Sequence, residues 1–164
     1  MELPDMELPG DLTRAIAPLF ETLPPDEALF RLVVTESASS SLVGTVETIL
    51  RDDALRDQPA LASALWLYID ELDRSHTVSQ GIDDSTGSFW HGIMHRREGD
   101  FSNSHYWFNK VGEHPAMVQV GGYDAHRMID EVETLHTDNP QHLIDLQRRE
   151  WQTLFAWSAV SYAS

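Results

Sequence analysis

The feature that most constrains the fold of this chain is the spacing of its apolar residues, which recur every three or four positions. An α-helix turns once in 3.6 residues, so this spacing gathers the apolar side chains on one helical face. Four such stripes stand out: Leu42, Val43, Val46, Ile49 and Leu50; Leu61, Leu65, Tyr68, Ile69 and Leu72; Met128, Ile129, Val132 and Leu135; and Ile144, Trp151, Leu154 and Phe155. Because the alternating patterns of strands are nearly missing, the sequence predicts an all-α fold.

Capping and stop signals place the helix boundaries. Asp11 can cap a helix that runs to about Leu23, before two prolines, and Pro140 opens the last helix. The segment Ala28–Val34 is ambiguous, since PDEALFRL favours helix whereas Val33-Val34-Thr35 suits a strand. Met117–Val120 (MVQV) is the other candidate strand.

The length of 164 residues fits one domain with a sizeable core. We expect a flexible lead-in over residues 1–10, followed by a single-domain helical bundle of about seven or eight helices over residues 11–164. A bundle of this size could also form a homodimer through an apolar stripe, and the sequence leaves that open.

Composition excludes several classes of function. A net charge of −16 with a single lysine, Lys110, argues against binding to nucleic acid or to anionic membrane surfaces. The chain has no cysteine, which excludes disulfides, thiolate nucleophiles and cysteine-based metal sites. It shows neither a signal peptide nor an apolar run of the roughly 18 residues that span a membrane, so we expect a cytoplasmic protein.

Residues 87–110 (GSFWHGIMHRREGDFSNSHYWFNK) form a locally cationic, aromatic segment in this acidic chain. They hold three of the eight histidines and three Lys or Arg residues against two Asp or Glu. A local reversal of charge with many aromatic and imidazole groups is typical of a ligand site.

The expected helix over Gly87–Arg97, capped by Ser85 or Thr86 and ended by Gly99, places His91, His95 and Glu98 in one stripe. Two imidazoles at positions i and i+4 can hold one transition metal, and a carboxylate one turn later can complete the set.

A second pair lies in the preceding helix, where Asp73 and His76 have the carboxylate-x-x-His spacing of metal sites in helical bundles. We therefore expect the metal ligands among His91, His95, Glu98, His76 and Asp73, with Zn, Mn or Fe as the candidate metal. The alternatives are histidines that are only hydrogen-bonded to carboxylates such as Glu98 or Asp100, and a metal-free acid–base site.

The neighbouring side chains supply candidate substrate contacts. Arg96 and Arg97 could clamp a carboxylate or phosphate, since guanidinium groups bind such anions bidentately; the alternative is pairing with the chain's own acids. Trp90, Asn103, Tyr106 and Trp107 offer flat surfaces and hydrogen bonds, with core packing as the alternative for each tryptophan. His105, which begins the next helical segment, is a further acid–base candidate, and we expect Trp90, His91, His95, His105 and Tyr106 to share one cavity.

The familiar catalytic and nucleotide-binding motifs are not found, among them HExxH, GxSxG and GxGxxG. The runs FWHGIMHRREGDFSNSHYWFNKVGEHP (Phe89–Pro115) and LQRREWQTLFAW (Leu146–Trp157), about a quarter of the chain, resemble an uncharacterised family of bacterial proteins. That resemblance implies no activity, cofactor or catalytic residue.

Two hypotheses about function follow. The first is a small enzyme that acts on a small polar metabolite, anionic or hydroxylated, by metal-assisted or histidine-based acid–base chemistry at His91, His95, Glu98 and His105. The second is a non-catalytic ligand-binding or helical interaction protein, in which the same segment is packing and a recognition surface. Metal content and the burial of the His91/His95 face distinguish them.

Overall fold

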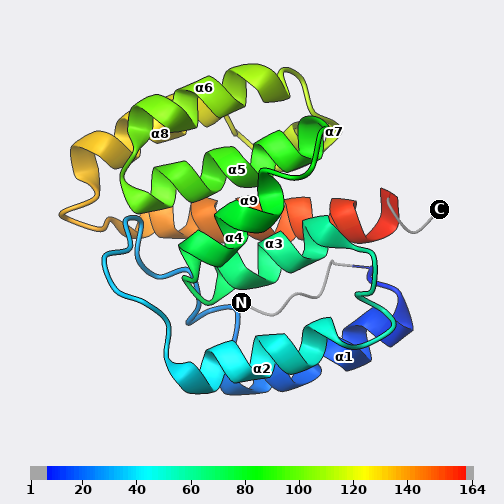
Figure 1. Cartoon of the computed structure of the whole chain (residues 1–164). Helices are drawn as coiled ribbons and strands as arrows, with labels where there is room; N and C mark the ends of the chain where they lie inside the picture. Colours follow the sequence, from blue (N-terminus) through cyan, green and yellow to red (C-terminus); the bar gives the residue numbers. More distant parts are fainter. Residues whose placement is uncertain (1–6, 162–164) are drawn as a thin grey trace.

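The computed structural model describes residues 7–161, and in that part of the chain every regular element is a helix (Figure 1). The all-α prediction is therefore confirmed. The helices are α1 (Gly10–Thr22), α2 (Ser40–Leu50), α3 (Pro59–Tyr68), α4 (Leu72–Ser79), α5 (Ser85–Glu98), α6 (Phe101–Val111), α7 (Pro115–Gln119), α8 (Ala125–Leu135) and α9 (Gln141–Ser161). Most of the expected lead-in, residues 1–6, lies outside the described residues. Within residues 7–161, none of these helices combines the length and the apolar character needed to cross a membrane.

The helices stack in layers, with α5 in the middle (Figure 1). Helices α1 and α2 lie together at one end, α3 and α4 come next, and α6 and α8 lie beyond α5, while α9 runs across the back. Helix α5 contacts α3, α4 and α6, and residues on every side of it are buried. Side chains on α5 therefore face the protein interior in all directions.

Helix α3 (PALASALWLY) explains part of this arrangement, because eight of its ten residues are buried. A helix that is apolar all round is stable only when other helices cover it. Helices α2, α4, α5 and α9 all contact it. The main core thus forms where α3, α5 and α9 meet, with Leu65, Trp90 and Trp151 among its buried side chains.

The stripe from Leu61 to Leu72 belongs to two helices rather than one. Helix α3 ends at Tyr68, and Asp70 takes a left-handed backbone conformation with φ 68°, which stops the helix. Arg97 on α5 binds the Asp70 carboxylate at 2.7 Å and holds the turn in place. The expectation of a single helix was wrong because the apolar spacing continues through the turn, and its consequence is a separate α4 that packs beside α5.

Segment 28–34 forms neither the helix nor the strand that its sequence allowed. Its backbone is irregular, and Leu29 has φ 58°. Side chains of distant helices bind its carbonyl groups: Gln147 Nε2 donates to Leu29 and Arg31, and Arg148 Nε donates to Ala28. These bonds replace the hydrogen bonds that a helix or strand would supply.

Three further details differ from the expectation. Asp11 lies inside the first turn of α1, which begins after Pro9. The cap of α5 is Asp84, whose carboxylate accepts from the Gly87 amide at 2.9 Å, instead of Ser85 or Thr86. Most of the candidate strand Met117–Val120 belongs to helix α7. Gly99 does end α5, in the left-handed conformation that was expected.

Candidate metal centre

Three histidines from two helices meet between α4 and α5. His91 and His95 lie one turn apart on α5 and are 2% and 7% exposed, while the half-buried His76 reaches them from α4. One ring nitrogen from each residue can be chosen so that all three lie within 4.8 Å of one another. We call these residues the three-His cluster.

The spacing of the rings fits a shared metal ion. Their centroids are 4.7 Å apart for His76 and His91, 5.3 Å for His76 and His95, and 4.7 Å for His91 and His95. Three imidazoles bound to one tetrahedral zinc through Zn–N bonds of about 2.0 Å would hold their centroids about 5 Å apart. The three rings are therefore spaced as three imidazole ligands of one ion would be.

His91 gives the strongest indication of a missing ligand. Neither of its ring nitrogens has a hydrogen-bond partner, although both are buried. Leaving a buried polar group without a partner costs about 1–3 kcal/mol, so such groups are rare and call for a specific explanation. A metal ion between the three rings would occupy one of these two nitrogens.

The cluster keeps His91 neutral, which is the form that binds metals. Burial lowers the pKa of His91 to about 3, and the nearby His95, His76 and Lys110 act in the same direction. The indole of Trp107 on α6 stacks on the His91 ring with centroids 3.7 Å apart and planes inclined by 15°. Lys110 in turn lies over Trp107, its Nζ 4.6 Å from the ring centroid. Trp107 therefore covers one face of the cluster.

Glu98 orients His95. The His95 Nδ1 lies 2.6 Å from Glu98 Oε1, and since a carboxylate can only accept, Nδ1 carries the proton. This leaves the lone pair of His95 on Nε2, free to bind a metal. Carboxylates that hold a ligating histidine in this way are a regular part of metal sites. Asp100 lies farther off, with its Oδ2 4.0 Å from His95 Nδ1, so that His95, Glu98 and Asp100 form a second, more exposed group.

Asp73, a predicted metal ligand, and His105, a predicted acid–base residue, lie apart from the three-His cluster. Asp73 is exposed on α4 and is not among the residues that converge with His76. His105 is on the opposite face of α6 from Trp107, where its ring nitrogens contact His126 at 2.7 Å and Asp130 at 2.9 Å. The structure therefore does not bring His105 and His91 into one shared cavity.

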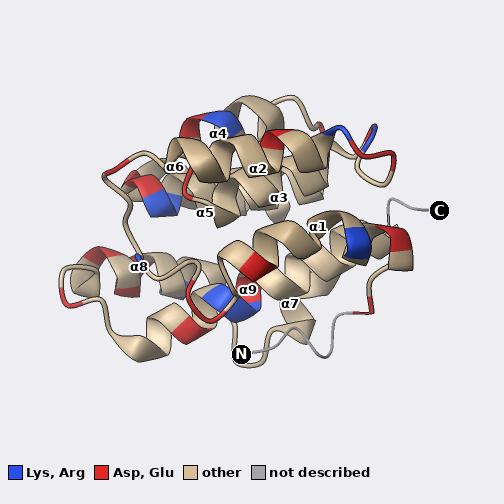
Figure 2. Cartoon of the chain, turned by 90° about the horizontal axis from the view of Figure 1, so that it is seen from below, with Lys and Arg blue, Asp and Glu red and all other residues tan. Residues whose placement is uncertain are grey.

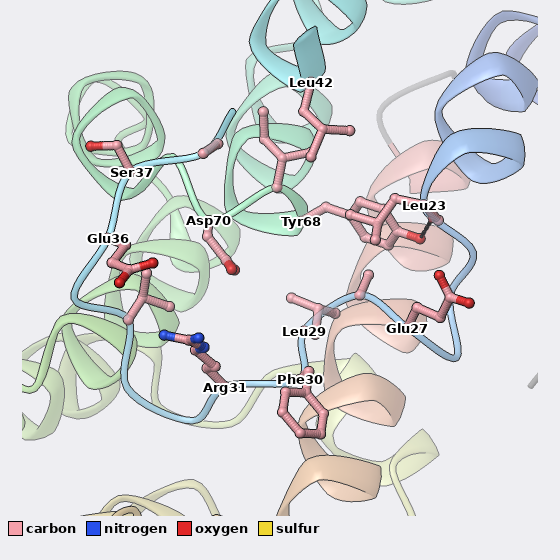
Figure 3. Close-up of a pocket in the computed structure, with 14 residues that line it drawn as sticks. Leu23, Glu27, Leu29, Phe30, Arg31, Glu36, Ser37, Leu42, Tyr68 and Asp70 are labelled. Atoms are coloured by element: carbon pink, nitrogen blue, oxygen red, sulfur yellow. Dashed lines mark hydrogen bonds between the residues drawn. The ribbon is translucent and has the colours of Figure 1, made fainter. Parts of the chain in front are cut away.

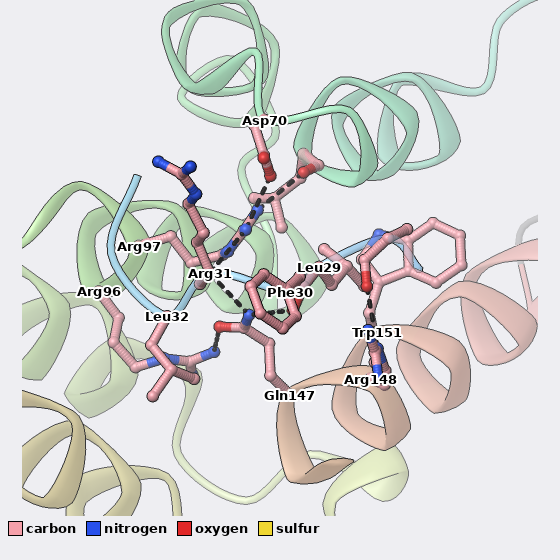
Figure 4. A network of polar contacts seen from close by, with 12 residues as sticks. Leu29, Phe30, Arg31, Leu32, Asp70, Arg96, Arg97, Gln147, Arg148 and Trp151 are labelled. Atoms are coloured by element: carbon pink, nitrogen blue, oxygen red, sulfur yellow. Dashed lines mark hydrogen bonds and ion pairs between the residues drawn. The ribbon is translucent and has the colours of Figure 1, made fainter. Parts of the chain in front are cut away.

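The two arginines are used inside the protein (Figure 4). Arg96 is fully buried and makes a bidentate ion pair with Glu150 on α9, with N–O distances of 2.7 and 2.9 Å. Arg97, equally buried, donates to the carbonyl groups of Leu67 and Arg31 and to the Asp70 carboxylate. In this conformation, neither guanidinium is available to clamp a substrate.

The remaining candidates divide between core and surface. Trp90 is fully buried, and its Nε1 donates to Ser158 at 3.3 Å. Tyr106 is 51% exposed, and Asn103 is exposed and bonds Asp100 at the start of α6. Of the predicted substrate contacts, Trp107 is the one that stacks on a ring of the three-His cluster.

A cavity of about 280 Å³ lies between segment 23–38 and the end of α3 (Figure 3). Leu29, Leu42 and Tyr68 contribute to its apolar wall, and Glu36 and Asp70 lie toward its other end. Nothing in the sequence indicated this cavity, because it depends on the irregular path of segment 28–34.

Comparisons of the chain with protein families, curated proteins and solved structures gave no match. The site is therefore interpreted from its own geometry.

Proposed function

We propose that this protein binds a divalent transition metal, Zn²⁺ first among the candidates, through His76, His91 and His95, and that it is a metal-dependent enzyme. The single observation that carries the proposal is the buried His91, whose ring nitrogens lack partners while two further imidazoles converge on it. Neutral imidazoles suit Zn²⁺ and Fe²⁺ better than Mn²⁺, which prefers oxygen ligands.

Three protein ligands are typical of catalytic rather than structural zinc, since structural sites use four. A metal held by three imidazoles supplies a Lewis acid with a coordination position left for water or substrate. The protein's own residues have distinct parts in this site. Glu98 fixes the protonation of His95, and Trp107 fixes the plane of His91 and excludes water from that side. The reaction class that we propose is metal-assisted hydrolysis or proton transfer on a small polar molecule.

The first test uses protein purified without a His tag, analysed for metal, stripped with a chelator and then melted with added Zn²⁺. A metal bound only by the native state stabilises it by about 2.7 kcal/mol at a concentration of 100 Kd, so the melting temperature should rise clearly at pH 8. The rise should be much smaller at pH 5, where protons compete for the ligands. The double variant His91→Ala/His95→Ala should lose the Zn²⁺ response and keep its helical circular dichroism.

The matched control is His136→Ala/His142→Ala, which removes two histidines outside the cluster and should respond to Zn²⁺ like the parent protein. A melting curve that does not move across Zn²⁺, Mn²⁺ and Fe²⁺ series, together with purified protein free of metal, would rule out the metal centre.

A further inference from the structure

His95 takes part in two groups of side chains that could each hold a metal ion. One is the three-His cluster, and the other consists of His95, Glu98 and Asp100. One ligand atom from each of the latter three residues can be chosen so that all lie within 4.8 Å of one another. We call these residues the His-Glu-Asp group. Its carboxylates face Nδ1 of His95, at 2.6 Å for Glu98 and 4.0 Å for Asp100, which leaves Nε2 for the three-His cluster.

The turn between α5 and α6 brings the two carboxylates to the same imidazole. Glu98 is the last residue of α5, and Gly99 takes the left-handed conformation with φ 84°. Asp100 then caps α6, because its carboxylate accepts from the Asn103 amide at 3.2 Å and from the Asn103 side chain at 2.7 Å. The backbone of the turn therefore fixes both carboxylates relative to His95.

The His-Glu-Asp group is buried on the histidine side and accessible on the carboxylate side. The side chain of His95 is 9% exposed, whereas those of Glu98 and Asp100 are 35% and 40% exposed. An ion from solution can therefore reach the carboxylates first. Water can complete its coordination, as it commonly does at sites rich in oxygen ligands.

The two carboxylates are not neutralised by a basic side chain. Across residues 7–161, no lysine or arginine forms an ion pair with Glu98 or Asp100. The adjacent Arg96 and Arg97 bind other carboxylates in the core. Glu98 also stands at the C-terminal end of α5, where the helix dipole disfavours a negative charge. Hydrogen bonds from Asn103 hold the pKa of Asp100 below its usual value, so its carboxyl group is ionised at neutral pH.

One imidazole and two carboxylates suit a divalent metal. Zn²⁺ accepts both nitrogen and oxygen ligands, and carboxylates also suit Mn²⁺. A proton now lies between Nδ1 of His95 and Glu98, and a cation can bind there only by displacing it. A metal held by Nε2 of the same ring favours this exchange, because a bound cation makes the groups that it coordinates more acidic.

We propose that Nδ1 of His95, Glu98 and Asp100 bind a second divalent cation, so that the His95 ring bridges two metal ions. The second cation displaces the proton on Nδ1, which passes to solvent, and each ring nitrogen then binds one ion. This proposal rests on the proposed function, since His95 also serves the three-His cluster. Glu98 orients His95 when one ion is bound and becomes a ligand when both are bound.

The experiment counts the ions and follows the proton of His95. The metal-free full chain, without a tag and with ¹⁵N-labelled histidines, is titrated with Zn²⁺ at pH 8 by calorimetry and by NMR. The first equivalent should occupy the three-His cluster and leave the proton on Nδ1 of His95. The second equivalent should remove that proton, and calorimetry should give two ions per chain.

Asp100→Asn is the variant that tests the second site without disturbing the first. Asparagine also caps helices well, and the hydrogen bond between Glu98 and His95 is left in place. The second ion should bind at least about tenfold more weakly, and the first should bind as in the parent. The matched control is Asp124→Asn, which makes the same change at the cap of α8, outside both groups, and should bind both ions as the parent does.

The possible failures have different meanings. One bound ion with the Nδ1 proton retained would keep the proposed function and overturn the second site. A second ion that Asp100→Asn binds as tightly as the parent would lie elsewhere and would overturn it too. A His95 ring protonated on both nitrogens throughout the titration would show an ordinary ion pair with the two carboxylates. Failure of the first equivalent to bind would remove the proposed function, and the bridging role of His95 with it.

Discussion

The ion pair between Arg96 and Glu150 shows how single residues hold α5 against α9. Both side chains are fully buried, and Tyr123 donates a further hydrogen bond to the same carboxylate at 2.5 Å. Burial and Glu150 together raise the pKa of the Tyr123 hydroxyl, so that it remains a donor. The pair is structural, and it is the second of the two alternatives that the sequence left for Arg96, pairing with the chain's own acids.

Removing one partner of this pair should be more harmful than removing both. Arg96→Met leaves the Glu150 carboxylate buried without its cation, which costs about 3–5 kcal/mol. The double variant Arg96→Met/Glu150→Met should be more stable than Arg96→Met alone, because no charge is then left unpaired. Urea unfolding of the two variants measures this, and a double variant no more stable than Arg96→Met would contradict it.

At residue scale, the sequence indicated the three-His cluster but not which partners the neighbouring side chains bind. His91, His95 and His76 could be named because helical spacing alone brings the first two together and the third lies in the preceding helix. The sequence left two choices for Arg96, substrate clamp or internal pair. The deciding partner, Glu150, is 54 residues away, and no local pattern connects them.

At the scale of elements, α5 and α6 approach closely at Gly92. A Cβ atom at this position would lie 2.8 Å from the Phe108 ring, and the Gly92 carbonyl accepts from Ser104 Oγ at 2.7 Å. This contact sets the separation of α5 and α6, and with it the position of Trp107 over His91.

Gly92→Ala should therefore destabilise the protein by about 1–3 kcal/mol, the usual cost of overpacking a core. Gly44→Ala is the matched control, because Gly44 is at an exposed position within α2 with nothing within 4 Å of the added Cβ. That change should stabilise by about 0.5–1 kcal/mol through helix propensity. Thermal unfolding of both variants measures the contrast, and equal effects would show that the helices can separate without cost.

Some elements could be predicted from sequence and others could not, for physical reasons. Helices with a long apolar stripe, such as α2 and α8, could be predicted because the stripe identifies both the helical period and the face that must be buried. The break after Tyr68 was missed because Asp70, unlike glycine, gives no sign of a left-handed turn. Segment 28–34 was missed because its hydrogen bonds come from α5 and α9, more than 60 residues farther along the chain.

At the scale of the whole molecule, the fold class followed from the sequence because every apolar stripe must be covered by another element. The stripes are buried in a main core and in a smaller cluster that includes Met128, Val132 and Ile144. The acidic charge is spread over many helices and loops (Figure 2), which accounts for its lack of influence on the fold. The cavities beside segment 23–38 depend on how all the layers meet, and no local pattern encodes that.

Stability of the metal-free protein should fall as the solution is acidified below neutral pH. Burial lowers the pKa of both His91, to about 3, and His114, so the unfolded chain binds protons more readily than the folded one. The stabilising contribution is complete above the unfolded pKa of about 6.5 and is lost as the pH falls toward the folded value. His91 alone should account for about 2 kcal/mol between pH 7.5 and 5.

Urea unfolding at these two pH values tests this expectation. His91→Gln should flatten the pH dependence by the stated amount, whereas His142→Ala, at an exposed position, should leave it unchanged. A parent protein equally stable at both values would show that His91 titrates normally in the folded state.

The hydrogen bonds that fix segment 28–34 also bear on how the protein is made. The partner of Ala28, Arg148, lies 120 positions later in the chain, and that of Leu29, Gln147, lies 118 positions later. A ribosome therefore produces this segment long before it produces α9, and in the interval its carbonyl groups can be satisfied only by water. We expect segment 28–34 to take its final path only after α9 has emerged, so that a segment made before helices α2 to α9 is among the last of the described parts to settle.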